Sequence, residues 1–313
     1  MQKTAYRLAI ASLILVAALG CARAADSGGK APKAPDTPDG VVYAFAEAVE
    51  NNHTEHIWKN LVPASYKTDI NEITTTFAKK MDPAVYDQAF EIVMRAIEVL
   101  DDRKDIILAS ETFKNSGADM EAIRTGLSNT LVFTETLKTS EVATVAGLSS
   151  VDWEQFLATT GNELIKQAKT IKAEEGENPL GSLDSLKVET VNATDDTATL
   201  RISSDDHEPE NVEMVKVEGC WIPADLASEW DKSMEEARQG LAEITPETMA
   251  AQKTQIMMFF GMADGLIEQI ATLQTPEEFD AAVGPLLAGF LGGPGMDMGE
   301  DEAWEYEEEP EEE

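Results

Sequence analysis

TATLRISS, residues 197–204, and VEMVKVEG, residues 212–219, decide the fold, because apolar and polar residues alternate along both segments. Successive side chains of a β-strand point to opposite faces, so a period of two predicts strands with one buried and one solvated face. The apolar run LKVETVNA, residues 186–193, precedes them, and the intervening Asp195-Asp196 is typical of a tight turn. We therefore expect a small antiparallel sheet over about residues 186–222.

The chain on the N-terminal side of this sheet has helical periodicity. Apolar residues recur three and four positions apart through residues 37–172, which predicts a series of amphipathic helices. Thr37-Pro38 and Asp82-Pro83 each pair a capping residue with a proline at the first helical position, so both mark helix starts. The segment AEEGENPLGS, residues 173–182, is rich in helix-ending residues and separates these helices from the sheet. The helices that we expect run over residues 37–51, 57–61, 63–77, 83–100, 118–137 and 152–172.

Helical spacing resumes after the sheet and continues over residues 225–291. Thr245-Pro246 restarts a long helix, and Thr275-Pro276-Glu277-Glu278 predicts a last helix that begins with a capping box. Residues 292–313 contain 11 acidic and no basic side chains, so we expect them to form a disordered acidic tail. The predicted fold class is α+β and predominantly helical. Its single domain covers residues 37–291, with helices at 37–172, the sheet at 183–223 and helices at 225–291.

The first residues have the pattern of an export signal. Lys3 and Arg7 precede an apolar run at residues 8–19, and small residues follow. The run has 12 residues, whereas a membrane-spanning helix needs about 20. We therefore expect a cleaved signal and no transmembrane span in the mature chain.

Two cleavage positions compete. Ala22-Arg23-Ala24 has small residues at the two positions that signal peptidase reads, and we favour cleavage after Ala24. This leaves a flexible tether at residues 25–36. Gly20-Cys21 resembles a lipobox, although Ala18 stands where leucine is usual, and cleavage before Cys21 would leave a lipid anchor. We expect an exported protein, periplasmic or extracellular, with membrane association only if Cys21 is lipidated.

The formal net charge of −35 restricts the choice of partners. A chain this acidic repels phosphate backbones, which argues against nucleic acid and favours a basic protein surface or divalent cations. Neither cleavage leaves an intramolecular disulfide between Cys21 and Cys220, so stability must come from burial. We interpret Cys220, next to Trp221, as a small buried apolar residue rather than a reactive thiol.

Few residues suggest a chemical site. His53 and His56 are three positions apart with Glu55 between them, a spacing that can hold zinc on one helical face. No H-E-x-x-H pattern or third ligand is indicated, so we interpret these residues as capping and surface groups. The acidic segment at residues 205–210 can attract calcium, but it lacks the glycine and the ligand spacing of an EF-hand loop. We interpret it as a solvated hairpin loop. No catalytic, cofactor-binding or metal-binding residue is assigned, and no cofactor is expected.

The apolar segment Met257-Met258-Phe259-Phe260, with Met262, allows two interpretations. Flexible methionines and aromatic rings can form an adaptable docking surface. Core packing is the default expectation for such residues in a long helix.

Part of the chain resembles a known family. The segments LVPASY (residues 61–66), VNATDDTATLRIS (191–203) and VEMVKVEGCWIP (212–223) look like exported or lipoprotein-type members of the nuclear-transport-factor-2-like (SnoaL-like) group. The resemblance covers residues 37–223 with a large helical insertion. It implies a helical cone packed against a curved antiparallel sheet, a fold that hosts enzymes and binding modules alike.

Two functional hypotheses follow. The first is an exported cell-envelope protein that acts as a non-catalytic binding or assembly module, because no nucleophile, base and orienting group are brought together by a known motif. The second is a small-ligand binder or hydrolytic enzyme that uses the pocket of the cone and sheet, with possible metal assistance from His53 and His56. The sequence favours the first hypothesis and does not identify the substrate or partner.

The cleavage position is directly testable. We expect the natively exported protein to have the intact mass of residues 25–313, because the small-residue pattern favours cleavage after Ala24. Intact-protein mass spectrometry checks this. A mass that begins at Cys21 and includes acyl chains would contradict the expectation and show that the protein is anchored.

Overall fold

A computed structural model describes residues 35–114, 119–174, 185–204 and 207–291. The described residues are 73% helical and include one small four-stranded antiparallel sheet, which confirms the predicted fold class. The expected signal at residues 1–24, most of the tether and the acidic segment 292–313 lie outside the described residues, as does Cys21.

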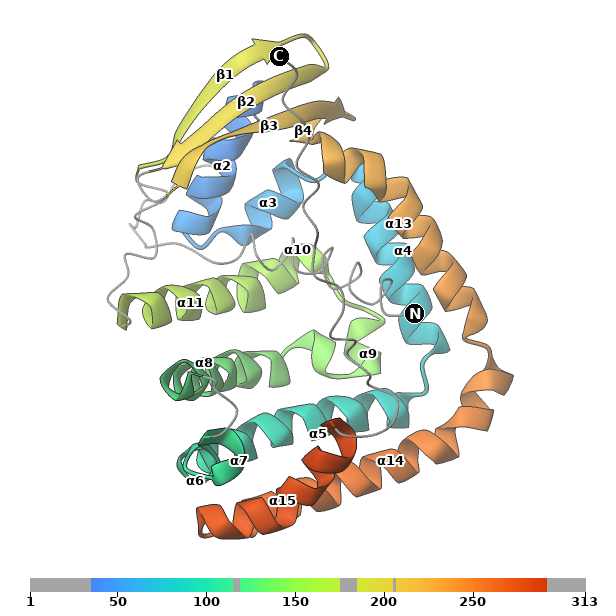
Figure 1. The fold of residues 1–313 in the computed structure, drawn as a ribbon. Coiled ribbons are helices and arrows are strands. Elements are labelled where there is room, and N and C mark those ends of the chain that lie inside the picture. Colours follow the sequence, from blue (N-terminus) through green and yellow to red (C-terminus); the bar gives the residue numbers. More distant parts are fainter. Residues whose placement is uncertain (1–34, 115–118, 175–184, 205–206, 292–313) are drawn as a thin grey trace, which may run out of the picture.

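The elements follow one another along the chain with the sheet between two groups of helices (Figure 1). The first group is α2 (Pro38–Glu50), α3 (Thr54–Asn60), α4 (Ala64–Lys80), α5 (Pro83–Asp102), α6 (Lys104–Leu108), α7 (Glu111–Lys114), α8 (Met120–Lys138), η1 (Glu141–Ala143), α9 (Val145–Leu148), α10 (Trp153–Phe156), η2 (Leu157–Gly161) and α11 (Asn162–Glu174). The sheet and the second group are β1 (Lys187–Ala193), β2 (Thr197–Ser204), β3 (His207–Val217), β4 (Cys220–Pro223), α13 (Ala224–Glu243), α14 (Pro246–Thr272) and α15 (Pro276–Leu291).

The strands lie in sequence order, and each is antiparallel to its neighbour. The predicted alternation is visible in β2, where Ala198 and Leu200 are buried while Arg201 is exposed. The buried face packs on α2, and its core contains Met214 and Trp221. The Trp221 indole N–H donates to the backbone oxygen of Asp36 at 3.3 Å, so the end of the expected tether is attached to the sheet.

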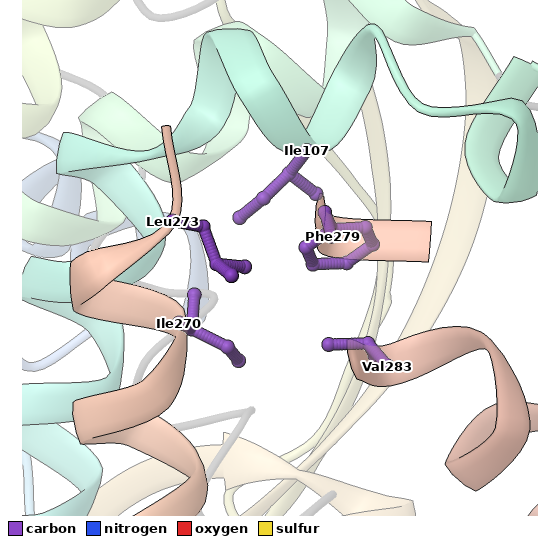
Figure 2. Close-up of a cluster of buried hydrophobic side chains, with 5 residues drawn as sticks. All are labelled: Ile107, Ile270, Leu273, Phe279 and Val283. Atoms are coloured by element: carbon purple, nitrogen blue, oxygen red, sulfur yellow. The ribbon is translucent and has the colours of Figure 1, made fainter. Parts of the chain in front are cut away.

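The other helices form successive layers below the sheet (Figure 1). α3 lies under α2 and is followed by α11, α8, α5 and α14, while α4 and α13 run side by side along one edge. A second core closes the far end, where α15 packs on α6 and the end of α14. Figure 2 shows its buried members, which are Ile107, Ile270, Leu273, Phe279 and Val283.

The predicted helix starts are confirmed, and one capping detail differs. Thr37 and Asp82 both accept hydrogen bonds from backbone amides in the first turns of α2 and α5. Thr275 accepts from the Glu278 amide at 3.2 Å, as a capping box requires. The Glu278 carboxylate, however, accepts from the Gln274 amide at 2.7 Å, one residue before its expected partner.

Several local predictions are wrong. The expected helix at 152–172 is interrupted by the π-helical turn η2, and residues 207–211, expected in a loop, belong to β3. The helical periodicity of residues 83–100 predicts that Val93 lies on the apolar face of α5, but Val93 is 53% exposed and the neighbouring Met94 is buried. The short helices α6, α7 and α9 were not predicted.

No helix among the described residues has both the length and the apolar composition that a membrane crossing requires. This agrees with the absence of a transmembrane span expected for the mature chain. The most apolar long helix, α14, includes Lys253 and Asp264, which form ion pairs with Asp82, the N-cap residue of α5, and with Arg95 of α5.

α4 and α13 are joined by a polar and aromatic contact. The rings of Tyr66 and Trp230 stack with centroids 3.8 Å apart and planes 7° from parallel. Asp69 accepts from the Trp230 indole N–H at 2.9 Å and from the Arg238 guanidinium at 2.6 Å. Arg238 also donates to Glu72 at 2.8 Å, and both carboxylates raise the pKa of its guanidinium.

Asp69→Ala should lower the free energy of unfolding by about 2 kcal/mol, because it leaves a half-buried indole N–H without its acceptor and removes one carboxylate from Arg238. Glu72→Ala is the matched control and should cost less than about 1 kcal/mol, because Glu72 is exposed and its ion pair with the guanidinium is screened by solvent. Urea unfolding of both variants measures the difference. Equal decreases in the free energy of unfolding of the two variants would contradict this prediction, because they would show that Asp69 stabilises the fold no more than Glu72 does.

Candidate functional sites

His53, Glu55 and His56 lie together where α2 passes into α3. One ligand atom from each residue lies within 4.8 Å of the other two. His53 Nδ1 is 3.1 Å from Glu55 Oε1, and His56 Nε2 is 3.7 Å from the same oxygen. The two imidazole rings stack with centroids 5.0 Å apart. Two imidazole nitrogens and a carboxylate oxygen therefore lie close together, and they form a donor set that transition metals use.

The carboxylate of this cluster is oriented by a residue from a distant part of the chain. Asn162 donates from Nδ2 to Glu55 Oε2 at 3.0 Å, which leaves Oε1 facing the histidines. Burial raises the pKa of Glu55, but hydrogen bonds from Asn162, its own backbone amide and His53 outweigh this, and the pKa is lowered. Glu55 is therefore held as an anion.

The predicted role of His53 as a helix cap is wrong. His53 occupies the capping position of α3 but makes no capping hydrogen bond through its side chain. Asn162 acts instead, because its Oδ1 accepts from the Thr54 amide at 2.9 Å and from the Thr54 hydroxyl at 3.0 Å. The imidazole of His53 therefore makes no capping hydrogen bond with the backbone of α3.

η2 brings α11 close enough for these contacts. The Thr54 hydroxyl shares its single proton between Asn162 Oδ1 and the backbone oxygen of Leu157, in the π-helical turn, which lies at 2.8 Å. Gly161 ends this turn, and a Cβ atom there would lie 2.9 Å from Thr54 Oγ1, so only glycine permits the approach. π-helical turns inside α-helices are often found at functional sites.

Lys169 of α11 holds the other end of the junction. Its side chain is buried and donates to the backbone oxygen of Glu50 at 3.1 Å and to the Asn52 side chain. Asn52 has a φ of 54°, the left-handed conformation that asparagine tolerates in turns. Burial lowers the pKa of Lys169 to about 8, although Glu50 opposes the shift.

Other predicted sites are not assembled in the described residues. Asp205 and Asp206 of the candidate calcium loop lie outside them, while Glu208 and Glu210 are exposed on β3. Cys220, expected to be buried, is half-buried. Burial raises the pKa of its thiol, which Lys67 partly opposes, so the thiol is protonated at neutral pH and is a weak nucleophile.

The default interpretation of the apolar segment in α14 is wrong, because three of its large side chains are exposed. Met258, Phe259 and Met262 are 63%, 62% and 61% exposed. They belong to the outer face of α14, which we define by its exposed residues between positions 251 and 265, a stretch flanked by the exposed Glu247 and Glu268: Ala251, Gln252, Thr254, Gln255, Met258, Phe259, Gly261, Met262 and Gly265. None of the residues of the outer face is charged. The charged residues of the same stretch, Lys253 and Asp264, pair with α5 on the opposite side.

Comparison with protein-family models, with curated proteins and with solved structures finds no match for this chain. The resemblance to nuclear-transport-factor-2-like proteins therefore stays a prediction.

Sequence reasoning found His53 and His56 but missed the residues that organise them. Asn162 and Lys169 are more than 100 positions away along the chain. A signal for Asn162 was present in the sequence Thr159-Thr160-Gly161, where β-branched residues and glycine weaken a helix. Nothing in the sequence pattern distinguishes Lys169 from Lys166, which is exposed on the same helix.

Burial of Lys169 should make stability depend on pH. The folded chain loses this proton at a pKa of about 8, whereas an unfolded lysine keeps it until about 10.4. The unfolded state therefore binds more protons between these values, and the free energy of unfolding should rise with pH there, by at most about 1.4 kcal/mol per unit.

Urea unfolding of the wild type and Lys169→Met from pH 7 to about 10.5 tests this pKa shift. The stability of the wild type relative to the variant should increase with pH across the interval. A constant difference would show that Lys169 has an ordinary pKa.

Proposed function

We propose that this chain is an exported cell-envelope protein that acts as a non-catalytic binding module. Its proposed ligand is an amphipathic helix of a partner protein, with an apolar stripe flanked by lysine or arginine. The single observation that carries the proposal is the exposure of Met258, Phe259 and Met262 on the outer face of α14.

The outer face offers the contacts that a helix needs. Two methionines and a phenylalanine within one helical turn provide a flexible apolar surface, which suits the anchor residues of a docked helix. Gly261 and Gly265 lie beside them, and a Cβ atom at either position would meet nothing within 4 Å. A partner backbone can therefore approach closely at these two positions.

Charge favours a basic partner. The chain has a formal net charge of −35, so it attracts a helix with lysine or arginine flanks and repels a second copy of itself. The outer face contains no charged residue that an apolar stripe would have to desolvate. The acidic surface of the chain would thus attract the lysine or arginine flanks of the partner helix, and the apolar stripe of that helix would be buried on the outer face of α14.

The alternative remains a small-ligand binder or hydrolytic enzyme that uses a pocket of the predicted nuclear-transport-factor-2-like kind. Its support in the described residues is the cluster of His53, Glu55 and His56. That cluster provides a metal donor set but does not identify a substrate.

A synthetic helix of leucine and lysine, with leucines on one face, is the probe for the proposed surface. We expect the full chain to bind it in fluorescence titrations, and the triple variant Met258→Ser, Phe259→Ser, Met262→Ser to bind at least about 10-fold more weakly, because each buried apolar side chain contributes roughly 1.5–3 kcal/mol. Val191→Ser is the matched control, because Val191 is a 57% exposed apolar residue of β1.

Equal binding by the wild type and the triple variant would contradict the proposal, because it would show that the acidic charge alone captures the peptide. A concentration-dependent dimer that the triple variant abolishes, measured by light scattering, would assign the outer face to a second copy instead. Added salt should weaken peptide binding without abolishing the difference between the wild type and the variant.

A further inference from the structure

We propose that His53, Glu55 and His56 form a binding site for a zinc-class divalent metal ion, with at least one coordination position open to solvent. This site is separate from the outer face of α14 and does not depend on the function proposed for that face. It reverses our sequence interpretation of the two histidines as capping and surface groups.

The spacing of the donor atoms is the first argument. Zinc bonds to histidine nitrogen and carboxylate oxygen at about 2.0–2.2 Å in tetrahedral geometry, which places neighbouring donors roughly 3.3–3.5 Å apart. Glu55 Oε1 lies 3.1 Å from His53 Nδ1 and 3.7 Å from His56 Nε2, on either side of that value. The two histidine nitrogens lie within 4.8 Å of each other, and rotation of the stacked imidazoles about their side-chain bonds would turn both nitrogens toward one ion.

The second argument is the support behind the carboxylate. Metal-binding carboxylates are usually fixed by hydrogen bonds from neighbouring groups. Asn162 Nδ2 binds Glu55 Oε2, so the other oxygen is left to face both imidazoles as a single ligand atom. Asn162 is itself fixed, because its Oδ1 accepts two hydrogen bonds from Thr54, which is buried.

The backbone around the cluster is also held in place. The amide of Thr54, at the start of α3, already has Asn162 as its acceptor, and Lys169 fixes the preceding turn through Glu50 and Asn52. The junction that carries the three ligands is thus preorganised by α11. A preorganised site loses less conformational entropy when an ion binds.

Solvent reaches the site from one side. The His53 side chain is 50% exposed, while those of Glu55 and His56 are 19% and 21% exposed. Three protein ligands leave the fourth tetrahedral position for water or for a donor from another molecule. Without an ion, the His53–Glu55 hydrogen bond occupies the same space, so metal binding must displace a proton there.

Isothermal titration of the metal-stripped full chain with zinc chloride tests the site. Excess magnesium should be present, because it competes for oxygen-only carboxylate sites on this acidic chain but hardly for imidazole. We expect one zinc ion per chain, and a loss of at least about 10-fold in affinity in His53→Ala and in His56→Ala. His207→Ala is the matched control, since His207 is the remaining histidine and lies at the start of β3, and it should bind zinc like the wild type.

His53→Ala is the deciding variant, because a half-exposed side chain without a capping bond can be removed without unfolding the chain, and circular dichroism confirms its fold. Cobalt(II) provides a second readout, since its visible absorption in the wild type should disappear in His53→Ala and persist in His207→Ala. Absence of zinc binding by the wild type, or equal binding by the wild type and His53→Ala, overturns the proposal.

Discussion

The hydrogen bonds of Asn162 are the constraint on which the arrangement of this protein most depends. One amide side chain accepts from the backbone and hydroxyl of Thr54 and donates to Glu55, so it joins the helices beneath the sheet to the helical layers below them. The contact requires the π-helical turn η2, which places α11 against α3, and Gly161, which leaves room for the Thr54 hydroxyl. A local irregularity in one helix thereby determines the start of another and the orientation of its carboxylate.

The junction between α2 and α3 also contains a buried charged group, the Lys169 ammonium. The Lys169 ammonium is taken out of water, which is costly, yet it satisfies a carbonyl and an amide oxygen that the turn between α2 and α3 leaves free. A buried polar group with such hydrogen bonds fixes a particular geometry rather than adding much stability. That distinction matters here, because a site made of three exposed or half-exposed ligands functions only if its backbone does not move.

The distribution of charge along α14 differs from that of an ordinary surface helix. The chain is strongly acidic, but the ionic residues in the middle of this helix face α5, where Asp264 pairs with Arg95 and Lys253 pairs with Asp82, the N-cap residue of α5. The outer face of α14 consists of alanine, glutamine, threonine, glycine, methionine and phenylalanine. This is the reverse of an ordinary amphipathic surface helix, in which charged residues face water. The reversal explains why the apolar periodicity of this segment suggested core packing, although the side chains concerned are exposed.

The sequence by itself determined the α+β class, the antiparallel strands and the starts of the main helices, because alternation, capping residues and prolines act over a few neighbouring positions. It also identified His53 and His56 as a pair with a ligand spacing. Tertiary structure alone decided that Glu55 completes the cluster, that Asn162 orients it, and that Met258 and Phe259 lie outside the core. These outcomes depend on contacts between residues more than 100 positions apart, or on which side of a helix is covered. A short-range pattern marks the weak point of the helix at Thr159-Thr160-Gly161, but it does not say which segment packs there, because the same segment can be packed from any direction.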